Sequence, residues 1–211
     1  MSDTQDVFAA ASAELAHRHP QIGRLYEIAG PCVLRSPQVD EFTALARAIV
    51  FQQLTGKAAG TIWGRVVAVL DGSPTPQRVF DTPEDDLRAA GLSRNKAASI
   101  RDLAAKALDG SVPLTGMEQL PDDEIVARLS AVRGIGVWTA EMFLIFQLRR
   151  LDVWPIGDLG VRKGYARAFE LAEVPSPKQL HTLGEDFRPF RTVGAWYCWR
   201  AVDTITPGAT E

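Results

Sequence analysis

The chain has 211 residues, 46% hydrophobic and 23% charged, a length and composition typical of one large globular domain or two small lobes. No apolar run approaches the roughly 20 residues that a membrane span needs, and the acidic N-terminal residues are unlike a basic signal peptide, so we expect a cytoplasmic protein. Two cysteines without a CxxC pair exclude a four-cysteine zinc site or iron–sulfur cluster within this chain, and we expect Cys32 and Cys198 to be reduced and partly buried.

Apolar residues recur with a helical period along almost the whole chain, and no segment alternates with the period of a strand, so the sequence predicts an all-α fold. We expect Thr82 and Ser93 to cap the two helices that follow them. A loop is expected at 73–76 and a free tail at 207–211. The expected helices, in chain order, cover 3–17, 20–30, a stretch that opens at 39–42, then 57–70, 83–91, 93–108, 121–132, 137–148, 158–169, and two stretches that open at 176 and 189.

A tight turn with the sequence Arg133-Gly134-Ile135-Gly136 separates two of these helices. The glycines permit unusual backbone angles and leave no side chain between the backbone and a ligand. The new helix then points its unpaired N–H groups at 137–139 outward, where a phosphate would fit. Such a turn holds a DNA backbone without reading its sequence. A plain interhelical turn is the alternative.

The charge distribution around this turn matters more than the total charge. The formal net charge of −3 argues against DNA binding, because phosphates are neutralised by lysine and arginine. Between residues 128 and 167, however, seven basic residues stand against three acidic ones. This local excess favours an anionic partner, although solvated helix faces would give the same pattern.

The stretch 132–140 resembles the signature of the helix-hairpin-helix DNA glycosylase superfamily, and Asp158, about 20 residues later, matches that family's catalytic aspartate. The segment 49–55 resembles the one that enters DNA at the lesion, while 187–191 and Trp199 resemble the closing helix. Over roughly residues 42 to 203 the likeness is greatest to the bacterial 3-methyladenine DNA glycosylase II branch. It implies two helical lobes around a DNA-binding cleft: 40–150, with the hairpin, and 1–39 with 151–211, with the aspartate.

Asp158 is the residue that we expect to be catalytic. Breaking an N-glycosidic bond builds positive charge on the sugar, which a carboxylate can stabilise while it orients the attacking water. Its position after Gly157 also suits a helix N-cap, and it could serve both roles. Asp152 is the competing carboxylate, but its place before Val153 suits an exposed turn.

The resemblance also implies how the base would be held. Trp138 occupies the place where strand-cleaving relatives carry a Schiff-base lysine, which implies a glycosylase without lyase activity. Its indole face would attract a cationic alkylated base, with Trp199 as a second wall and Phe51 as a further contact. For each of these the alternative is core packing. The remaining pocket candidates are Trp154, Trp196 and Tyr197.

Other residues are expected to touch DNA rather than the base. Gln53 matches the wedge that fills the gap left by the flipped base, where this branch often has leucine, and Gln52 would be a neighbouring minor-groove contact. Hairpin carbonyls near Val132 and Ile135 are implied as ligands of a monovalent cation, whereas a metal held by side chains is not expected. The expected phosphate contacts are Arg133, Gly134, Gly136, Thr139, Arg162 and Lys163.

Together these features predict a monofunctional DNA glycosylase that flips out and excises alkylated purines of the 3-methyladenine and 7-methylguanine type. We expect a cytoplasmic bacterial monomer that acts on double-stranded DNA, in a short form without the N-terminal β-rich domain of larger relatives, and without a cofactor. The alternatives are a mismatch or oxidised-base glycosylase, a non-catalytic helix-hairpin-helix DNA-binding module, and a helical scaffold with no nucleic-acid role.

Overall fold

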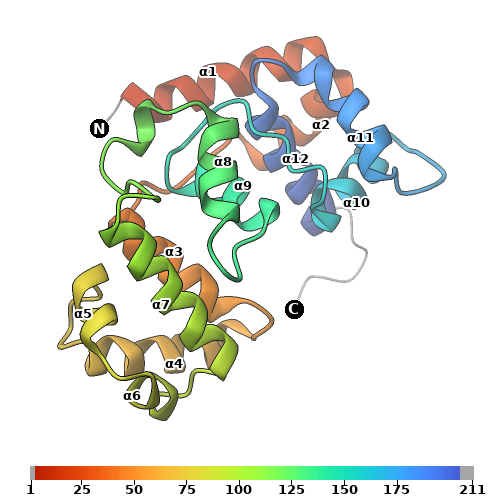
Figure 1. The fold of residues 1–211 in the computed structure, drawn as a ribbon. Helices are drawn as coiled ribbons and strands as arrows, with labels where there is room; N and C mark the ends of the chain where they lie inside the picture. The colour runs from red at the N-terminus through yellow and green to blue at the C-terminus, as the bar shows by residue number, and fades with distance from the viewer. Residues whose placement is uncertain (1–2, 205–211) are drawn as a thin grey trace. The chain divides into compact units, whose positions relative to one another are not determined.

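A computed structural model describes residues 3–204 of the chain, so the predicted tail at 207–211 lies outside the described residues. Over these residues the fold is helical throughout and contains no strand, which confirms the predicted all-α class. Figure 1 shows the elements in chain order: α1 (Asp3–Arg18), α2 (Pro20–Ala29), α3 (Glu41–Phe51), α4 (Gly56–Val69), α5 (Pro76–Asp81), α6 (Glu84–Ala89), α7 (Arg94–Leu108), η1 (Met117–Gln119), α8 (Asp122–Ser130), α9 (Val137–Phe146), α10 (Leu159–Ala168), α11 (Pro177–Leu183), η2 (Gly184–Phe187) and α12 (Arg191–Thr204).

The chain forms two compact units: a central unit, Pro37–Phe143, and a terminal unit, Met1–Ser36 with Leu144–Glu211. Helix α9 begins in the central unit and ends in the terminal unit. The sequence placed the lobe boundaries at 40 and 150, and that division stays a prediction.

The central unit is built around α7, which packs against α3, α5 and α6 (Figure 1). Apolar residues of α3 recur at positions 42, 45 and 49, so they share one helix face, and all three are buried. Ile100 and Leu103 of α7 are fully buried in the same unit. The remaining face of α7 is therefore available for polar contacts.

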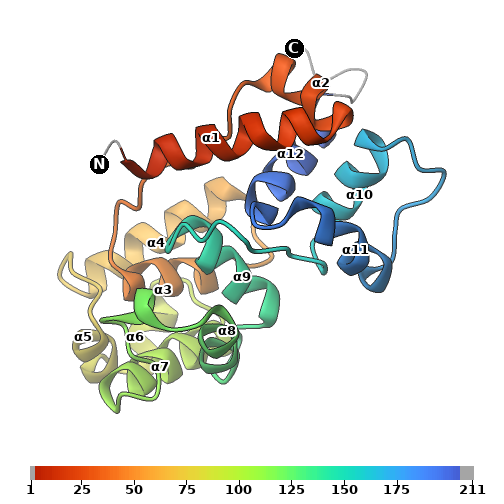
Figure 2. The ribbon, with the colours of Figure 1, turned by 90° about the horizontal axis from the view of Figure 1, so that it is seen from above.

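The terminal unit is built around α12, which packs against α10, α2 and α1, and Figure 2 shows it beneath α1. Tyr197 lies at the centre of α12 with no exposed surface, and its hydroxyl donates to the Gly30 carbonyl at 2.9 Å. Cys32 and Cys198 are both buried, and among the described residues no disulfide joins them. Burial raises the pKa of the Cys32 thiol to about 12, which keeps it inert.

Most helix ends lie within two residues of their predicted positions, and Ser93 caps α7 as expected, accepting the Lys96 N–H at 3.3 Å. One short helix was missed, and one cap was wrong. The six-residue α5 is too short to show a helical period in the sequence. Thr82 therefore ends α5 instead of capping α6, and its hydroxyl donates to the Arg78 carbonyl at 2.7 Å. The last helix begins at Arg191, two residues after its predicted start at Pro189.

Candidate functional site

The predicted turn between α8 and α9 is present, and its glycines serve different needs. Gly134 has φ +78°, and a Cβ there would lie 2.6 Å from the Ser99 hydroxyl, so only glycine fits without strain. A Cβ on Gly136 would meet nothing within 4 Å. Val132 and Ile135 are buried, as the core side of a hairpin requires. The protein itself therefore demands glycine at 134, while the space beside 136 is open to a ligand.

The first turn of α9 follows directly after Gly136. The Ala140 N–H bonds to the Gly136 carbonyl at 3.1 Å, which leaves the N–H groups of residues 137–139 beyond the reach of helical acceptors. Trp138 is 47% exposed, whereas Thr139 is only 7% exposed. The Thr139 hydroxyl instead lies 3.5 Å from the side-chain nitrogen of Gln52. The geometry thus supports backbone N–H groups as phosphate donors and does not support the Thr139 hydroxyl.

The Gln52–Gln53 pair forms the turn that follows α3. Gln52 caps the helix, and its side-chain amide donates to the Gly134 carbonyl at 2.9 Å. Gln53 is exposed and takes φ +57°, a conformation uncommon for residues other than glycine. The structure therefore uses the amide of Gln52 to join two loops of the central unit, while the Gln53 side chain stays exposed.

The remaining predicted contacts of the central unit already have partners within the protein. The exposed Arg133 donates its backbone N–H to Asp102 at 2.7 Å and its guanidinium to Asn95 at 3.2 Å. Phe51 is half-buried, and the guanidinium of Arg47 lies 4.1 Å from the centre of its ring. One face of Phe51 is thus covered by the protein's own cation, which weakens its case as a base contact.

The cation implied for the hairpin can be compared with the carbonyls present there. The Val132 carbonyl accepts the Ile135 N–H at 3.1 Å, and a carbonyl oxygen has a second lone pair for a cation. The Gly134 carbonyl likewise accepts one hydrogen bond, from the side-chain amide of Gln52. The Val132 carbonyl therefore keeps a lone pair for the implied cation, as the Gly134 carbonyl also does. Among the described residues, no group of three or more His, Cys, Asp or Glu is placed to hold a metal ion.

In the terminal unit, Asp158 is the N-cap of α10, as its position predicted. Its Oδ1 accepts the Val161 N–H at 2.7 Å and the indole N–H of Trp199 at 3.0 Å. A Cβ on Gly160 would lie 3.0 Å from both the Asp158 Oδ1 and the Trp199 ring, so the absence of a side chain there lets the two meet. The carboxylate is half-buried and held in orientation by donors from two helices.

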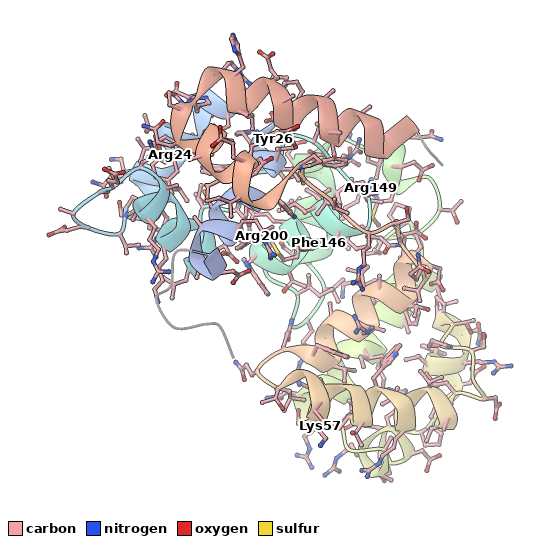
Figure 3. The ribbon with its side chains drawn as sticks, turned by 180° about the vertical axis from the view of Figure 1, so that it is seen from behind. Arg24, Tyr26, Lys57, Phe146, Arg149 and Arg200 are labelled. Atoms are coloured by element: carbon pink, nitrogen blue, oxygen red, sulfur yellow. The ribbon has the colours of Figure 1, made fainter. Side chains whose placement is uncertain are left out.

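Trp199 is stacked on Phe146, with ring centres 5.7 Å apart and an angle of 23° between the planes. Phe146, labelled in Figure 3, is the last residue of α9 and is 47% exposed. Phe146 was not among the predicted site residues, because it lies in a continuous apolar run where every residue suits the core. An exposed aromatic ring thus adjoins the indole that binds Asp158.

The expectation for Asp152 was wrong. Its carboxylate accepts from Arg191 at 2.7 Å and from Arg188 at 2.6 Å, and the side chain is 28% exposed. Since Arg191 is largely buried, Asp152 is its structural counterion and not a group in an exposed turn. The partners lie 36 and 39 residues further along the chain, beyond the reach of a local pattern.

Two of the further aromatic candidates belong to the core. The buried indole of Trp154 donates to the Leu180 carbonyl at 2.8 Å, and Tyr197 is fully buried, so neither can line an open pocket. Trp196 is half-buried beside Arg200, whose guanidinium lies 5.5 Å from the ring centre. In α10, Arg162 donates to the Pro175 carbonyl at 2.7 Å, whereas Lys163 is exposed.

Comparison with known proteins places these features in a family. Residues 46–189 match the model of the HhH-GPD superfamily of base excision DNA repair proteins. The chain is 37% identical over 164 residues to DNA-3-methyladenine glycosylase 1 of Schizosaccharomyces pombe, covering 76% of this chain and 72% of that protein.

Two solved structures are similar as a whole. A 3-methyladenine DNA glycosylase of S. pombe in complex with abasic DNA is 32% identical with a TM-score of 0.79, covering 96% of this chain and 100% of that one. A DNA-3-methyladenine glycosidase from Bacillus halodurans is 34% identical with a TM-score of 0.82, covering 88% of this chain and 85% of that one.

In the described part of the chain, the helices are too short or too polar to cross a membrane.

Proposed function

We propose that this chain, which belongs to the HhH-GPD superfamily of base excision DNA repair proteins, is a monofunctional DNA glycosylase that removes alkylated purines of the 3-methyladenine and 7-methylguanine type. The observation that carries the proposal is the carboxylate of Asp158, oriented by the first turn of α10 and by the indole of Trp199. The names of the similar glycosylases support the substrate class. Double-stranded DNA as partner, a monomeric state and a cytoplasmic location are parts of the same proposal.

The reaction needs little more than this carboxylate. Cleavage of the bond between the sugar C1′ and the base passes the bonding electron pair to the base and leaves positive charge on the sugar. In a purine alkylated at N3 or N7 that pair neutralises the base, so no general acid is required. Asp158 stabilises the sugar cation, water adds at C1′, and its proton passes to the carboxylate or to solvent.

Aromatic groups would select the base. Trp138 offers a half-exposed indole whose face attracts a cation, and Phe146 offers an exposed ring backed by Trp199. The main role of Trp199 is therefore to orient the Asp158 carboxylate, and its second role is to support the ring of Phe146 beside the base. Because Trp138 cannot form a Schiff base, the proposal excludes strand cleavage through an amine at this position.

DNA would be held by the central unit. The N–H groups at 137–139 and the open side of Gly136 suit a phosphate, and exposed Arg133 adds positive charge. In the terminal unit the exposed Lys163, and Arg162 beside it, would make further phosphate contacts. A monovalent cation held by the carbonyls of Val132 and Ile135 would increase the attraction for the backbone.

The test is release of bases from defined DNA duplexes by the wild-type protein and by Asp158→Asn. We expect the wild type to release 7-methylguanine and 3-methyladenine, detected by mass spectrometry, and to leave the strands intact. Asp158→Asn should lower the rate by roughly 1,000-fold while binding to abasic-site DNA is kept. Release of oxidised or mismatched bases in preference to alkylated ones would favour the first alternative. Equal DNA binding with no release by either protein would favour the non-catalytic module.

A further inference from the structure

One face of α7 carries polar residues that sequence analysis did not connect with function. They are Asn95, Lys96, Ser99 and Asp102, and their spacing of three and four residues places them along one side of the helix. The opposite side is buried in the core of the central unit. Each of the four contacts either the hairpin or the Gln52–Gln53 turn, and we call this set the α7 polar face.

Lys96 contacts the turn that carries Gln53. Its ammonium donates to the carbonyls of Val50 and Gln52, each at 2.7 Å. These belong to the end of α3, where carbonyls have no helical donor and where a cation is favoured by the helix dipole. Burial lowers the pKa of Lys96, yet the side chain is kept there by two short hydrogen bonds. The left-handed conformation of Gln53 thus follows directly after a carbonyl that Lys96 holds.

The rest of the α7 polar face contacts the hairpin. Asp102 accepts the Arg133 backbone N–H at 2.7 Å, and Asn95 accepts from the Arg133 guanidinium. The Ser99 hydroxyl lies against Gly134, 2.6 Å from the position that a Cβ would take. Gln52 completes the connection by donating to the Gly134 carbonyl. One helix therefore fixes both the hairpin and the Gln53 turn, all within the central unit.

We propose that Lys96 is a positioning residue: it fixes the Gln52–Gln53 turn in the conformation needed to enter DNA at a damaged site, without contacting DNA itself. The inference rests on the proposed function, with Gln53 in the place beside a flipped nucleotide that the family resemblance implies. The hairpin keeps its own support from Asp102 and Ser99. Loss of Lys96 should therefore weaken recognition of damaged DNA while leaving general affinity for the DNA backbone.

The test compares Lys96→Met, which removes the donors, with Lys96→Arg, which keeps them. Lys178→Met, at an exposed position of α11, is the control for loss of one positive charge. Fluorescence anisotropy gives Kd for duplexes with and without an abasic-site analogue. Hydrogen–deuterium exchange on the free protein follows the segment 50–56 and the hairpin separately. Single-turnover release of 7-methylguanine gives the rate.

We expect Lys96→Met to raise the Kd for abasic-site DNA about 10-fold. The Kd for undamaged DNA should change less than about 2-fold. The rate of base release should slow about 10-fold, because a small misplacement of reacting groups lowers the rate. Exchange should quicken in 50–56 and not in the hairpin. Lys96→Arg should recover most of the loss, and Lys178→Met should match the wild type.

An equal loss of affinity for both DNAs, or unchanged exchange in 50–56, would overturn the proposal, as would wild-type behaviour of Lys96→Met. If the wild type released no alkylated base, the proposed function would fail by itself, whereas the ratio of the two Kd values and the exchange would still decide the role of Lys96. If the wild type released no alkylated base and also bound both DNAs equally, both the proposed function and the role of Lys96 would be wrong.

Discussion

The central unit holds two turns in place by hydrogen bonds to their backbone, whereas the terminal unit holds one carboxylate by hydrogen bonds and packs aromatic rings beside it. Around the hairpin, Gln52, Lys96 and Asp102 all bind main-chain atoms of turns. Around Asp158, the carboxylate accepts the Val161 backbone N–H and the indole N–H of Trp199, whose ring stacks on Phe146. The first arrangement fixes the path of a backbone that can hold phosphates, and the second orients one carboxylate beside exposed apolar rings. In the proposed function, the central unit supplies most of the DNA contacts and Asp158 of the terminal unit supports cleavage of the glycosidic bond.

We expect the largest loss of DNA affinity from Gly134→Ala, with Gly136→Ala as the variant for comparison. At 134 a Cβ meets the Ser99 hydroxyl at 2.6 Å and the backbone has φ +78°, so the hairpin must distort. Affinity for damaged and undamaged DNA should fall together, by roughly 10- to 100-fold, the loss of about one charge-assisted hydrogen bond, and the unfolding temperature should drop.

Gly136→Ala should instead leave the unfolding temperature unchanged, because its Cβ has open space, and weaken DNA binding only through contact with the ligand. Thermal unfolding and anisotropy on the two variants separate these effects. Intact DNA affinity in both variants would rule out the hairpin as the phosphate site.

A smaller effect, on rate alone, is expected from Gly160→Ala in the terminal unit. The added Cβ would lie 3.0 Å from both the Asp158 carboxylate and the Trp199 ring, and would push them apart. We expect single-turnover base release to slow about 10-fold with unchanged affinity for abasic-site DNA. Gly157→Ala is the matched control, since its Cβ would meet nothing within 4 Å. A parallel loss of affinity would show that the two functions are not separated.

Phe146→Ala should change selectivity more than rate. An aromatic ring in contact with the base contributes about 0.5 to 1.5 kcal/mol, so without the ring of Phe146 the preference for alkylated over unmodified purines should fall by roughly 2- to 10-fold. Competition between the two substrates measures this ratio. Phe80→Ala, at an equally exposed phenylalanine on α5, should leave it unchanged. Unaltered selectivity in Phe146→Ala would remove Phe146 from the base pocket.

The smallest effect concerns stability, through Asp102. Burial alone would raise the pKa of this carboxyl, but the hydrogen bond from the Arg133 N–H and the partner Lys106 hold it below its usual value. Its stabilisation is therefore complete above about pH 4 and is lost as the pH falls through the lower folded-state pKa. Asp102→Asn should lower the unfolding free energy by about 1 kcal/mol at pH 7, with the difference shrinking only below about pH 4. Urea unfolding at several pH values checks this, and a difference that shrinks near pH 6 would contradict it.

The sequence indicated local features well and long-range partners poorly. The all-α class, the hairpin with buried Val132 and Ile135, and the N-cap role of Asp158 follow from periodicity, glycine spacing and capping preferences, each within a few residues. The bond between Trp199 and Asp158 joins residues 41 apart, and Lys96 reaches back 44 residues to Gln52. Such contacts depend on how helices pack, and the same limit explains the error over Asp152.

The most direct test of whether DNA binding and base release depend on different residues uses two variants, Asp158→Asn and Gly134→Ala. For each, we would measure the Kd for abasic-site DNA and the single-turnover rate of 7-methylguanine release at saturating protein. Asp158→Asn should lose roughly 1,000-fold in rate and less than about 2-fold in affinity, and Gly134→Ala should lose mainly affinity. An Asp158→Asn protein that loses both in proportion, or that keeps its rate, would contradict the account.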